Sequence, residues 1–211
     1  MTNLEDALVA VEAGADAVGF VFYEKSPRKI DVETARKIVK QLPSDLEKVG
    51  VFVGEATDSA DEIMRRAELT VAQVYTKSII GWLAWHETTE RKLMVAVPGN
   101  VLNGDLLMST GSAKKRFHAI VADSGSGDRP GGTGQRFNWE RAKVGIWAIE
   151  TEVPVVVAGG LTPENVAEAI KTLRPWGVDV ASGVEARPGK KDPEKVRAFV
   201  RAVREMDRKV S

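Results

Sequence analysis

The chain has 211 residues and a mass of 22.9 kDa, which is enough to bury one sizeable hydrophobic core. Its 30 basic and 30 acidic side chains cancel, which excludes the strongly basic surface expected of a protein that binds nucleic acid or an anionic membrane. The chain has no cysteine, which excludes disulfides and thiolate sites. It also has no basic N-terminal region and no run of about 18 apolar residues, which excludes a signal peptide and a membrane span. We therefore predict a soluble, cytoplasmic protein of one domain over residues 1–211.

The first predicted element is a helix rather than a strand. Leu4, Ala7, Leu8 and Val11 form an apolar stripe with helical spacing, and Gly14 is a typical stop signal. No strand precedes this stripe. If the fold is a closed barrel of eight parallel strands, the chain therefore lacks the first of them.

Seven short apolar runs follow, and we predict that they are parallel strands. They are apolar throughout rather than alternating, which is typical of strands that are covered on both faces. In chain order they are residues 17–22, 48–53, 71–75, 92–97, 119–123, 153–158 and 178–181.

Segments with helical spacing lie between these runs. Asp31 and Asp58 each precede one such segment, and Thr162-Pro163-Glu164 and Asp192-Pro193-Glu194 open two more. Regular alternation of strand and helix predicts an α/β fold, either a doubly wound open sheet or a closed barrel. Composition does not choose between the two.

Small residues at two strand ends are candidates for binding phosphate. Gly159 and Gly160 follow the sixth predicted strand just before a helix start, where free N–H groups and the helix dipole favour an anion. Ser182 and Gly183 form a second small-residue turn after the last strand. Paired loops in these positions are a common phosphate site in barrels. The alternative for the first is a tight turn with Thr162 as a helix cap.

Two charged residues at strand ends are candidates for acting on a substrate. Asp123 ends a strand and precedes the glycine-rich segment 125–134, so a loop closing over it could raise its pKa and make it a general acid. The alternative is an aspartate that only caps the loop. Arg28 follows the first strand, where its guanidinium could pair with a substrate carboxylate or simply be solvated.

Other kinds of chemistry find little support. His86 and His118 are the only histidines, and neither has a partner at metal-ligand spacing, so we predict no metal site. His86 lies in a stripe with Trp82 and Trp85, which more often packs a helix than binds a ligand. The chain has no G-x-S-x-G, Walker or dinucleotide-binding motif, which excludes serine hydrolases, P-loop NTPases and Rossmann enzymes.

Long segments of the chain resemble the phosphoribosylanthranilate isomerase family of tryptophan biosynthesis. Residues 2–30 resemble the family's segment after its first strand, residues 48–53 its third strand, and residues 131–139 (GGTGQRFNW) the region after its sixth. Residues 153–166 (VPVVVAGGLTPENV) and 174–192 (RPWGVDVASGVEARPGKKD) resemble its last two strands with their phosphate loops.

The resemblance implies a (β/α)8 TIM barrel that carries out an Amadori rearrangement of N-(5'-phosphoribosyl)anthranilate without a cofactor or metal. It implies Asp123 as the general acid, Arg28 as the partner of the anthranilate carboxylate and Asp179 as a supporting residue at the substrate. The residues that it implies for the phosphate are Gly159, Gly160, Ser182 and Gly183. The expected partners are this small molecule and phosphate or sulfate ions, with no nucleic acid and no membrane.

The chain departs from the family in two places. The family's first strand carries a cysteine that is the general base, and this chain has neither that strand nor any cysteine. It also has Gln73-Val74-Tyr75-Thr76 where the family has Gln-Leu-His-Gly. We therefore expect an impaired isomerase. The alternatives are a phosphosugar-binding barrel without turnover, or another sugar-phosphate isomerase that uses a different base, with Tyr75 and His86 as its first candidates.

Overall fold

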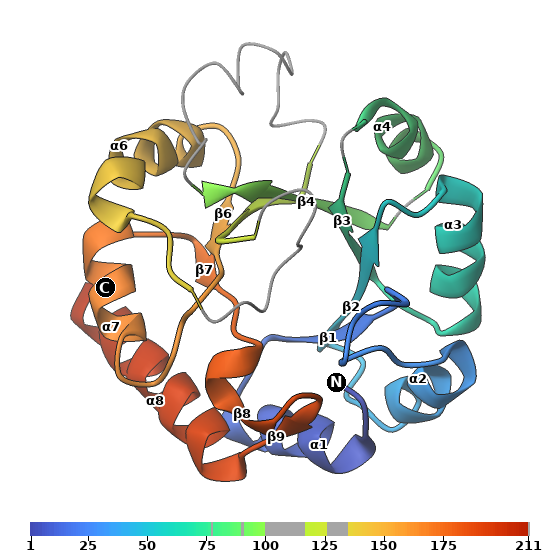
Figure 1. Ribbon diagram of the computed structural model, residues 1–211, viewed down its shortest axis with the longest axis horizontal. Coiled ribbons are helices and arrows are strands. Elements are labelled where there is room, and N and C mark those ends of the chain that lie inside the picture. The colour runs from blue at the N-terminus through green and yellow to red at the C-terminus, as the bar shows by residue number, and fades with distance from the viewer. Residues whose placement is uncertain (77, 90, 100–116, 126–134, 211) are drawn as a thin grey trace.

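One curved sheet of parallel strands forms the centre of the protein. The computed structural model describes residues 1–76, 78–89, 91–99, 117–125 and 135–210, with only the backbone of residues 209 and 210. Within these residues seven strands pair in chain order, and helices pack around the outside of the sheet (Figure 1). This confirms the predicted TIM-barrel type of α/β fold, with seven parallel strands of its sheet among the described residues.

The strands begin and end close to the predicted positions. They are β1 (Ala17–Val21), β2 (Glu47–Val53), β3 (Val71–Tyr75), β4 (Lys92–Pro98), β5 (Ala119–Asp123), β6 (Val155–Val157) and β7 (Gly177–Val178). The predictions for β3 and β5 match to the residue. The last two strands are shorter than predicted, because β6 ends before Gly159 turns into the left-handed region and β7 has a ladder on one side only.

Helices connect the strands, and most of their start signals act as predicted. They are α1 (Leu4–Ala13), α2 (Val32–Val39), α3 (Thr57–Arg66), α4 (Ile80–Glu87), α6 (Trp139–Glu150), α7 (Val166–Leu173) and α8 (Pro193–Val210). Asp31 and Asp192 accept hydrogen bonds from the first turns of α2 and α8. Asp58 is not a cap, because α3 begins before it, at Thr57. No helix in the described part of the chain is both long and apolar enough to cross a membrane.

An apolar core fills the space between the helices and the sheet. Phe52 of β2 is fully buried and lies 6.0 Å from Trp82 of α4, measured between ring centroids, and Trp82 packs edge-on against Trp85 at 5.6 Å. The prediction that this aromatic stripe packs a helix is confirmed.

A seam separates the two end strands of the sheet. Among the described residues β1 pairs only with β2 and β7 only with β6, so no ladder joins β1 to β7. A cavity of about 380 Å³ lies there, lined largely by apolar side chains that include Val178 of β7 and Val196 and Phe199 of α8. A closed barrel of eight parallel strands has one more strand at this point.

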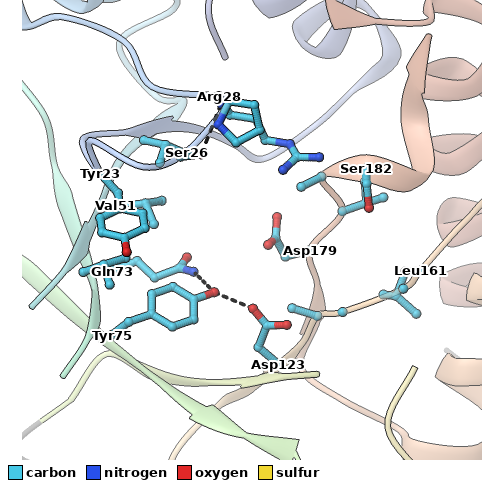
Figure 2. A pocket seen from close by; sticks show the side chains of 18 of the residues that line it. Tyr23, Ser26, Arg28, Val51, Gln73, Tyr75, Asp123, Leu161, Asp179 and Ser182 are labelled. Atoms are coloured by element: carbon cyan, nitrogen blue, oxygen red, sulfur yellow. Dashed lines mark hydrogen bonds between the residues drawn. The ribbon is translucent and has the colours of Figure 1, made fainter. Parts of the chain in front are cut away.

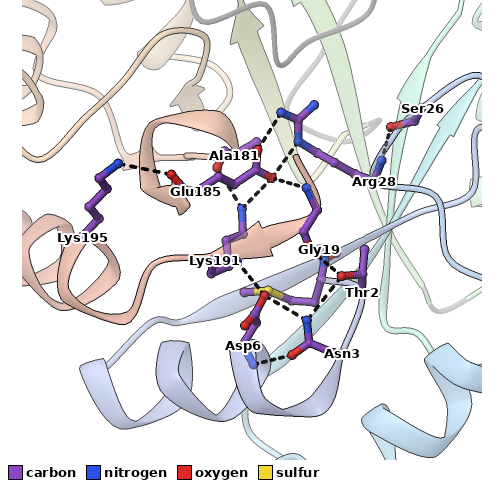
Figure 3. Close-up of polar contacts among 12 residues, drawn as sticks. Thr2, Asn3, Asp6, Gly19, Ser26, Arg28, Ala181, Glu185, Lys191 and Lys195 are labelled. Carbon is purple, nitrogen blue, oxygen red and sulfur yellow. Dashed lines mark hydrogen bonds and ion pairs between the residues drawn. The ribbon is translucent and has the colours of Figure 1, made fainter. Parts of the chain in front are cut away.

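Polar contacts hold the two sides of the seam together. The antiparallel pair β8 (Glu185–Arg187) and β9 (Lys190–Lys191) lies beside α1 (Figure 1). The carboxylate of Asp6 accepts a hydrogen bond from the Lys190 ammonium at 2.7 Å. It also accepts one from the Lys191 N–H at 2.7 Å (Figure 3). Burial alone would raise the pKa of Asp6, but these bonds and one from Asn3 outweigh it and lower the pKa. Asp6 is therefore a buried carboxylate that ties α1 to the far side of the seam.

Candidate active site

A cavity of about 370 Å³ opens where the strands end. Its wall is formed by the carboxyl ends of β1, β2, β3, β5, β6 and β7 and by the turns that follow several of them (Figure 2). The carboxyl ends of parallel strands meet at one face of the sheet, so residues far apart in the sequence come together here. The predicted site residues on this wall are Arg28, Asp123, Gly159, Gly160, Asp179 and Ser182.

Asp123 is held by three hydrogen-bond donors. It is the last residue of β5 and is 3% exposed. Its Oδ2 accepts from the Tyr75 hydroxyl at 2.5 Å, and its Oδ1 accepts from the Gly125 N–H at 3.1 Å and the Ser124 hydroxyl at 3.4 Å. These donors fix the position of the carboxyl group at the end of β5. The loop 125–134 that we expect to close over Asp123 lies, apart from Gly125, outside the described residues.

Tyr75 is a donor to Asp123 rather than a base. Burial, and then the nearby charge of Asp123, raise the pKa of the Tyr75 phenol well above its ordinary value, so it keeps its proton at neutral pH. The amide of Gln73 donates to the same hydroxyl at 3.3 Å. His86, the other alternative base, lies on α4 with its Nδ1 3.1 Å from the Arg91 carbonyl, away from this wall. Neither alternative base is supported.

Asp179 is the second carboxyl of the cavity. It follows β7, and its exposed side chain points into the same cavity as Asp123 (Figure 2). Burial, and then the charge of Asp123, raise the pKa of Asp179. The site therefore holds two acidic side chains in unlike surroundings.

Two glycine turns meet at the end of the cavity near Leu161 and Ser182. Gly159 and Gly160 have φ values of +80° and +66°, and a Cβ on Gly159 would lie 2.4 Å from the backbone nitrogen of Ser124. A Cβ on Gly183 would lie 1.8 Å from the Leu161 carbonyl oxygen, so this contact between the two loops requires glycine. The structure brings the two predicted phosphate loops side by side.

Asn165 fixes the first of these loops. Its side-chain amide donates to the Gly160 carbonyl at 3.0 Å, and its Oδ1 accepts from the Thr162 N–H at 2.9 Å. This explains why α7 begins at Val166, later than the predicted start at Thr162. The second loop forms a short 3-10 turn, Ser182–Val184. Backbone N–H groups at such turns are typical ligands of phosphate oxygens.

Arg28 reaches the cavity from the opposite side and is held by a buried glutamate. Its Nε and Nη2 each lie 2.8 Å from one oxygen of Glu185, and the Glu185 side chain is only 5% exposed (Figure 3). Burial alone would raise the pKa of Glu185, but the Arg28 hydrogen bonds and the charge of Lys191 lower it. Because Arg28 has five N–H donors, donors remain for a ligand.

No sequence signal predicted the pairing of Arg28 with Glu185. The two residues are 157 positions apart, and no spacing rule connects them. Glu185 is thus a neighbour of the cavity that pattern alone did not identify, and the bond of Tyr75 to Asp123 was not predicted either. The described residues hold no cluster of three or more His, Asp or Glu side chains that could bind a metal ion.

Arranged in this way, the cavity suits an elongated anion. The guanidinium of Arg28, the carboxyls of Asp123 and Asp179, and the two glycine turns all line this one cavity. The guanidinium matches a carboxylate, the turns match a phosphate, and carboxyls of unlike surroundings are suited to proton transfer.

Known proteins share this sequence and this fold. The sequence model of the family described as N-(5'phosphoribosyl)anthranilate (PRA) isomerase matches residues 1–202. An N-(5'-phosphoribosyl)anthranilate isomerase of Pseudomonas fluorescens (strain Pf0-1) is 41% identical over 205 residues, which cover 97% of this chain and 95% of that protein. The crystal structure of phosphoribosyl anthranilate isomerase from Thermotoga maritima has a TM-score of 0.82 and 37% identity, covering 97% of this chain and 96% of that one.

A further crystal structure is of such an isomerase in complex with reduced 1-(o-carboxyphenylamino)-1-deoxyribulose 5-phosphate, abbreviated rCdRP. It has a TM-score of 0.79 and 37% identity, and the match covers 97% of this chain and 95% of that one. The ligand in that complex carries a carboxylate and a phosphate on one molecule.

Proposed function

Since the chain belongs to the N-(5'-phosphoribosyl)anthranilate isomerase family of tryptophan biosynthesis, we propose that its cavity binds N-(5'-phosphoribosyl)anthranilate and converts it to 1-(2-carboxyphenylamino)-1-deoxyribulose 5-phosphate. The reaction is an Amadori rearrangement, in which the ribose ring opens and hydrogen moves within the molecule. That the reaction takes place in the cytoplasm is a prediction from the composition of the chain.

The observation that carries this proposal is that one cavity holds a group for each part of the substrate. Arg28 suits its carboxylate, Asp123 and Asp179 suit its reacting carbons, and the two glycine turns suit its phosphate. A substrate held at both ends keeps its ribose carbons against the carboxyls, and such positioning accounts for a large part of the rate in reactions of this kind.

At the phosphate end, we assign binding to the turns that contain Gly159, Gly160, Ser182 and Gly183. Backbone N–H groups would be the main donors, as at other loops that precede helical turns. At the other end, Arg28 would form a bidentate pair with the anthranilate carboxylate, with Glu185 holding the guanidinium in place. A phosphate or sulfate ion alone should occupy the first of these positions.

For the chemistry, we assign Asp123 as the acid that protonates the ribose ring oxygen. As this proton arrives, the bond between C1 and the ring oxygen breaks, and the nitrogen lone pair forms the C=N bond of an iminium. The departing proton leaves Asp123 as a carboxylate, which Tyr75, Ser124 and the Gly125 N–H stabilise. Stabilising the form that is left behind makes proton donation easier.

We also propose that turnover is slower than in relatives with a thiol base. General-base catalysis usually contributes about 10²- to 10⁴-fold, and this chain has no cysteine to supply it in the usual way. A phosphosugar-binding barrel without turnover stays the alternative, and it would keep the ligand binding described above.

Loss of anthranilate fluorescence on ring opening tests the proposal. The purified chain should consume N-(5'-phosphoribosyl)anthranilate, and Asp123→Asn should lower kcat by about 10²-fold or more while binding rCdRP with an affinity within a few-fold of the parent. If parent and variant bind rCdRP equally but consume no substrate, the chain is a phosphosugar-binding barrel without turnover. A chain that neither binds nor reacts would overturn the proposal.

A further inference from the structure

The three hydrogen bonds to Asp123 differ in length and in kind. The Gly125 N–H lies 3.1 Å and the Ser124 hydroxyl 3.4 Å from Oδ1, whereas the Tyr75 hydroxyl lies 2.5 Å from Oδ2. A hydroxyl at about 2.5–2.7 Å from a carboxyl oxygen is typical of a charge-assisted bond, which is about twice as strong as a neutral one. The bond from Tyr75 is therefore the one whose strength depends most on the charge of the carboxyl.

Tyr75 reaches Asp123 across a whole strand. It ends β3, whereas Asp123 ends β5, and β4 lies between these two strands. Neighbouring strands are about 4.8 Å apart, so a side chain on β3 has to span about twice that distance. The Tyr75 ring packs on a cluster of small side chains that includes Ala96 of β4 and Ala119 of β5. A side chain that ends at the ring, such as phenylalanine, leaves Oδ2 without this donor.

Gln73 sets the direction of the Tyr75 hydroxyl. It is two residues before Tyr75 on β3, so both side chains lie on the face of the sheet that lines the cavity. Gln73 is only 7% exposed, and its side-chain amide donates to the Tyr75 hydroxyl oxygen at 3.3 Å (Figure 2). A hydroxyl has one proton, and because Gln73 donates to its oxygen, that proton is left to point at Asp123.

The phenol acts on Asp123 through this hydrogen bond and not as an acid of its own. Burial, and then the charge of Asp123, raise the pKa of Tyr75 well above its ordinary value. Tyr75 therefore keeps its proton while Asp123 gives one away. The hydrogen bonds run in one direction, from Gln73 to Tyr75 and from Tyr75 to Asp123 (Figure 2).

We propose that Gln73 and Tyr75 are positioning residues for Asp123, which rests on the proposed function of Asp123 as the acid. Gln73 directs the Tyr75 proton to Oδ2, and Tyr75 holds the carboxyl while Asp123 gives its proton to the ribose ring oxygen. The bond between C1 and the ring oxygen breaks, the nitrogen lone pair forms the C=N bond, and no other reactant is required. As negative charge develops on the carboxyl, the bond from Tyr75 strengthens. An interaction that strengthens toward the transition state raises kcat rather than affinity.

Removal of one hydroxyl from the full chain tests the role of Tyr75. Tyr75→Phe should lower kcat by about 10- to 10²-fold, while KM and the affinity for rCdRP stay within about twofold, because the lost bond is strongest in the transition state. Tyr23→Phe is the matched control. Tyr23 is the other tyrosine of the chain and lines the same cavity, and loss of its hydroxyl leaves the bonds to Asp123 intact, so this variant should behave as the parent.

A double-mutant cycle tests whether Gln73 acts through Tyr75. Gln73→Met keeps the length of the side chain but removes its amide. We expect kcat to fall about threefold, less than for Tyr75→Phe, because a bond of 3.3 Å is weak. In the Tyr75→Phe background the same change should not lower kcat further, since the hydroxyl that Gln73 directs is gone. Effects that multiply would show that Gln73 does not act through Tyr75.

A proton NMR spectrum tests the hydrogen bond independently of turnover. A hydroxyl proton in a short bond to a carboxyl, shielded from water, should appear downfield of the amide protons. The parent and Tyr23→Phe should show this signal, and Tyr75→Phe should lack it. Its absence from the parent would mean that the bond is not formed and would overturn the proposal.

The outcomes separate this inference from the proposed function. If the parent is active and Tyr75→Phe keeps more than about a third of its kcat, or if KM rises while kcat is unchanged, Tyr75 does not support the acid and the isomerase stands. If the parent binds rCdRP but does not turn over, Asp123 is not a working acid and the roles of Gln73 and Tyr75 fail with it. If the parent neither binds nor reacts, the proposed function itself has failed.

Discussion

The arc of the sheet and the seam between β1 and β7 are held together by different forces. Along the arc every neighbouring pair of strands shares a parallel ladder, so backbone hydrogen bonds fix the register. Across the seam, α1 packs on α8, and side chains make the polar bridges, Asp6 to β9 and Arg28 to Glu185. Side chains at the seam therefore provide contacts of the kind that backbone hydrogen bonds provide along the arc.

The active site spans both regions. Asp123, Tyr75 and the Gly159–Gly160 turn stand on the arc, whereas Arg28 and Asp179 follow the two end strands that border the seam. Changes on the arc should therefore affect chemistry and phosphate binding, and changes at the seam should affect stability together with the position of Arg28.

The largest expected effect comes from making the seam resemble the arc. Joining Lys-Ile-Cys-Gly-Ile upstream of Met1 offers a strand that can form ladders with β1 and β7, bury the apolar cavity and supply a thiol base. We expect the unfolding midpoint to rise by at least about 5 °C and kcat by about 10²-fold.

The matched control carries Ser in place of that Cys. It should raise the unfolding midpoint in the same way without raising kcat. If the parent chain already equals the extended chain in both stability and turnover, an added strand at the seam contributes to neither property. Differential scanning calorimetry and the fluorescence assay measure the two effects.

A substitution in the glycine turns should abolish ligand binding. In Gly183→Val the new Cβ would lie 1.8 Å from the Leu161 carbonyl oxygen, so the two loops must move apart. We expect the affinity for rCdRP to fall by about 10²-fold in a calorimetric titration, because the backbone N–H groups of the two turns can no longer bind the same phosphate group. An unchanged affinity would remove this contact from the phosphate site.

The next effect concerns the seam's buried carboxylate. Asp6→Asn keeps the size of the side chain but loses the charge that faces Lys190, and we expect the free energy of unfolding at pH 7 to fall by about 2 kcal/mol in urea. The pKa of Asp6 is lowered in the folded state, so its contribution is complete above the unfolded value of about 3.9 and is lost as the pH falls through the folded value. The difference between parent and variant should therefore shrink as the pH falls below about 4.

Glu24→Ala is the control for this variant, since Glu24 forms an exposed pair with Lys29. Its removal should leave the urea midpoint unchanged, as is usual for surface ion pairs. A gap between parent and Asp6→Asn that stays constant down to pH 2 would mean that the charge of Asp6 is not what stabilises the seam.

The smallest effect is expected at Glu185. Glu185→Gln retains one acceptor for Arg28 but loses the bidentate charged pair, so the guanidinium should be less well placed for a substrate carboxylate. We expect KM to rise about three- to tenfold with kcat within a factor of two. A drop in kcat with an unchanged KM would assign Glu185 to the chemistry instead.

Local patterns predicted the arc well and the seam poorly. Apolar runs gave β3 and β5 to the residue, because strands buried on both faces leave a continuous signal. The pairs Arg28 with Glu185 and Asp6 with Lys190 join residues more than 150 positions apart, and such contacts exist only once the fold has formed. The hydrogen bond of Tyr75 to Asp123 was missed for the same reason.

Start signals were reliable where a side chain caps the helix and unreliable elsewhere. Asp31 and Asp192 cap their helices as predicted. By contrast, α3 begins after Ala56 with no side-chain cap, and α7 begins only after Asn165, whose side chain bonds to the preceding loop. Glycines and charged residues at strand ends are visible in a sequence, so the residues that line the cavity could be named as candidates. The distances between them cannot be read from a sequence. A single domain over residues 1–211 stays a prediction.

The most direct test of a cavity that holds the substrate at both ends is a crystal structure of this chain with rCdRP. The account predicts the phosphate between residues 159–161 and 182–184, bonded mainly to backbone N–H groups, and the anthranilate carboxylate on the Arg28 guanidinium. It also predicts both Asp123 and Asp179 beside the ribose-derived carbons. A phosphate bound elsewhere, with those amides turned away and Arg28 out of contact with the ligand, would contradict the account.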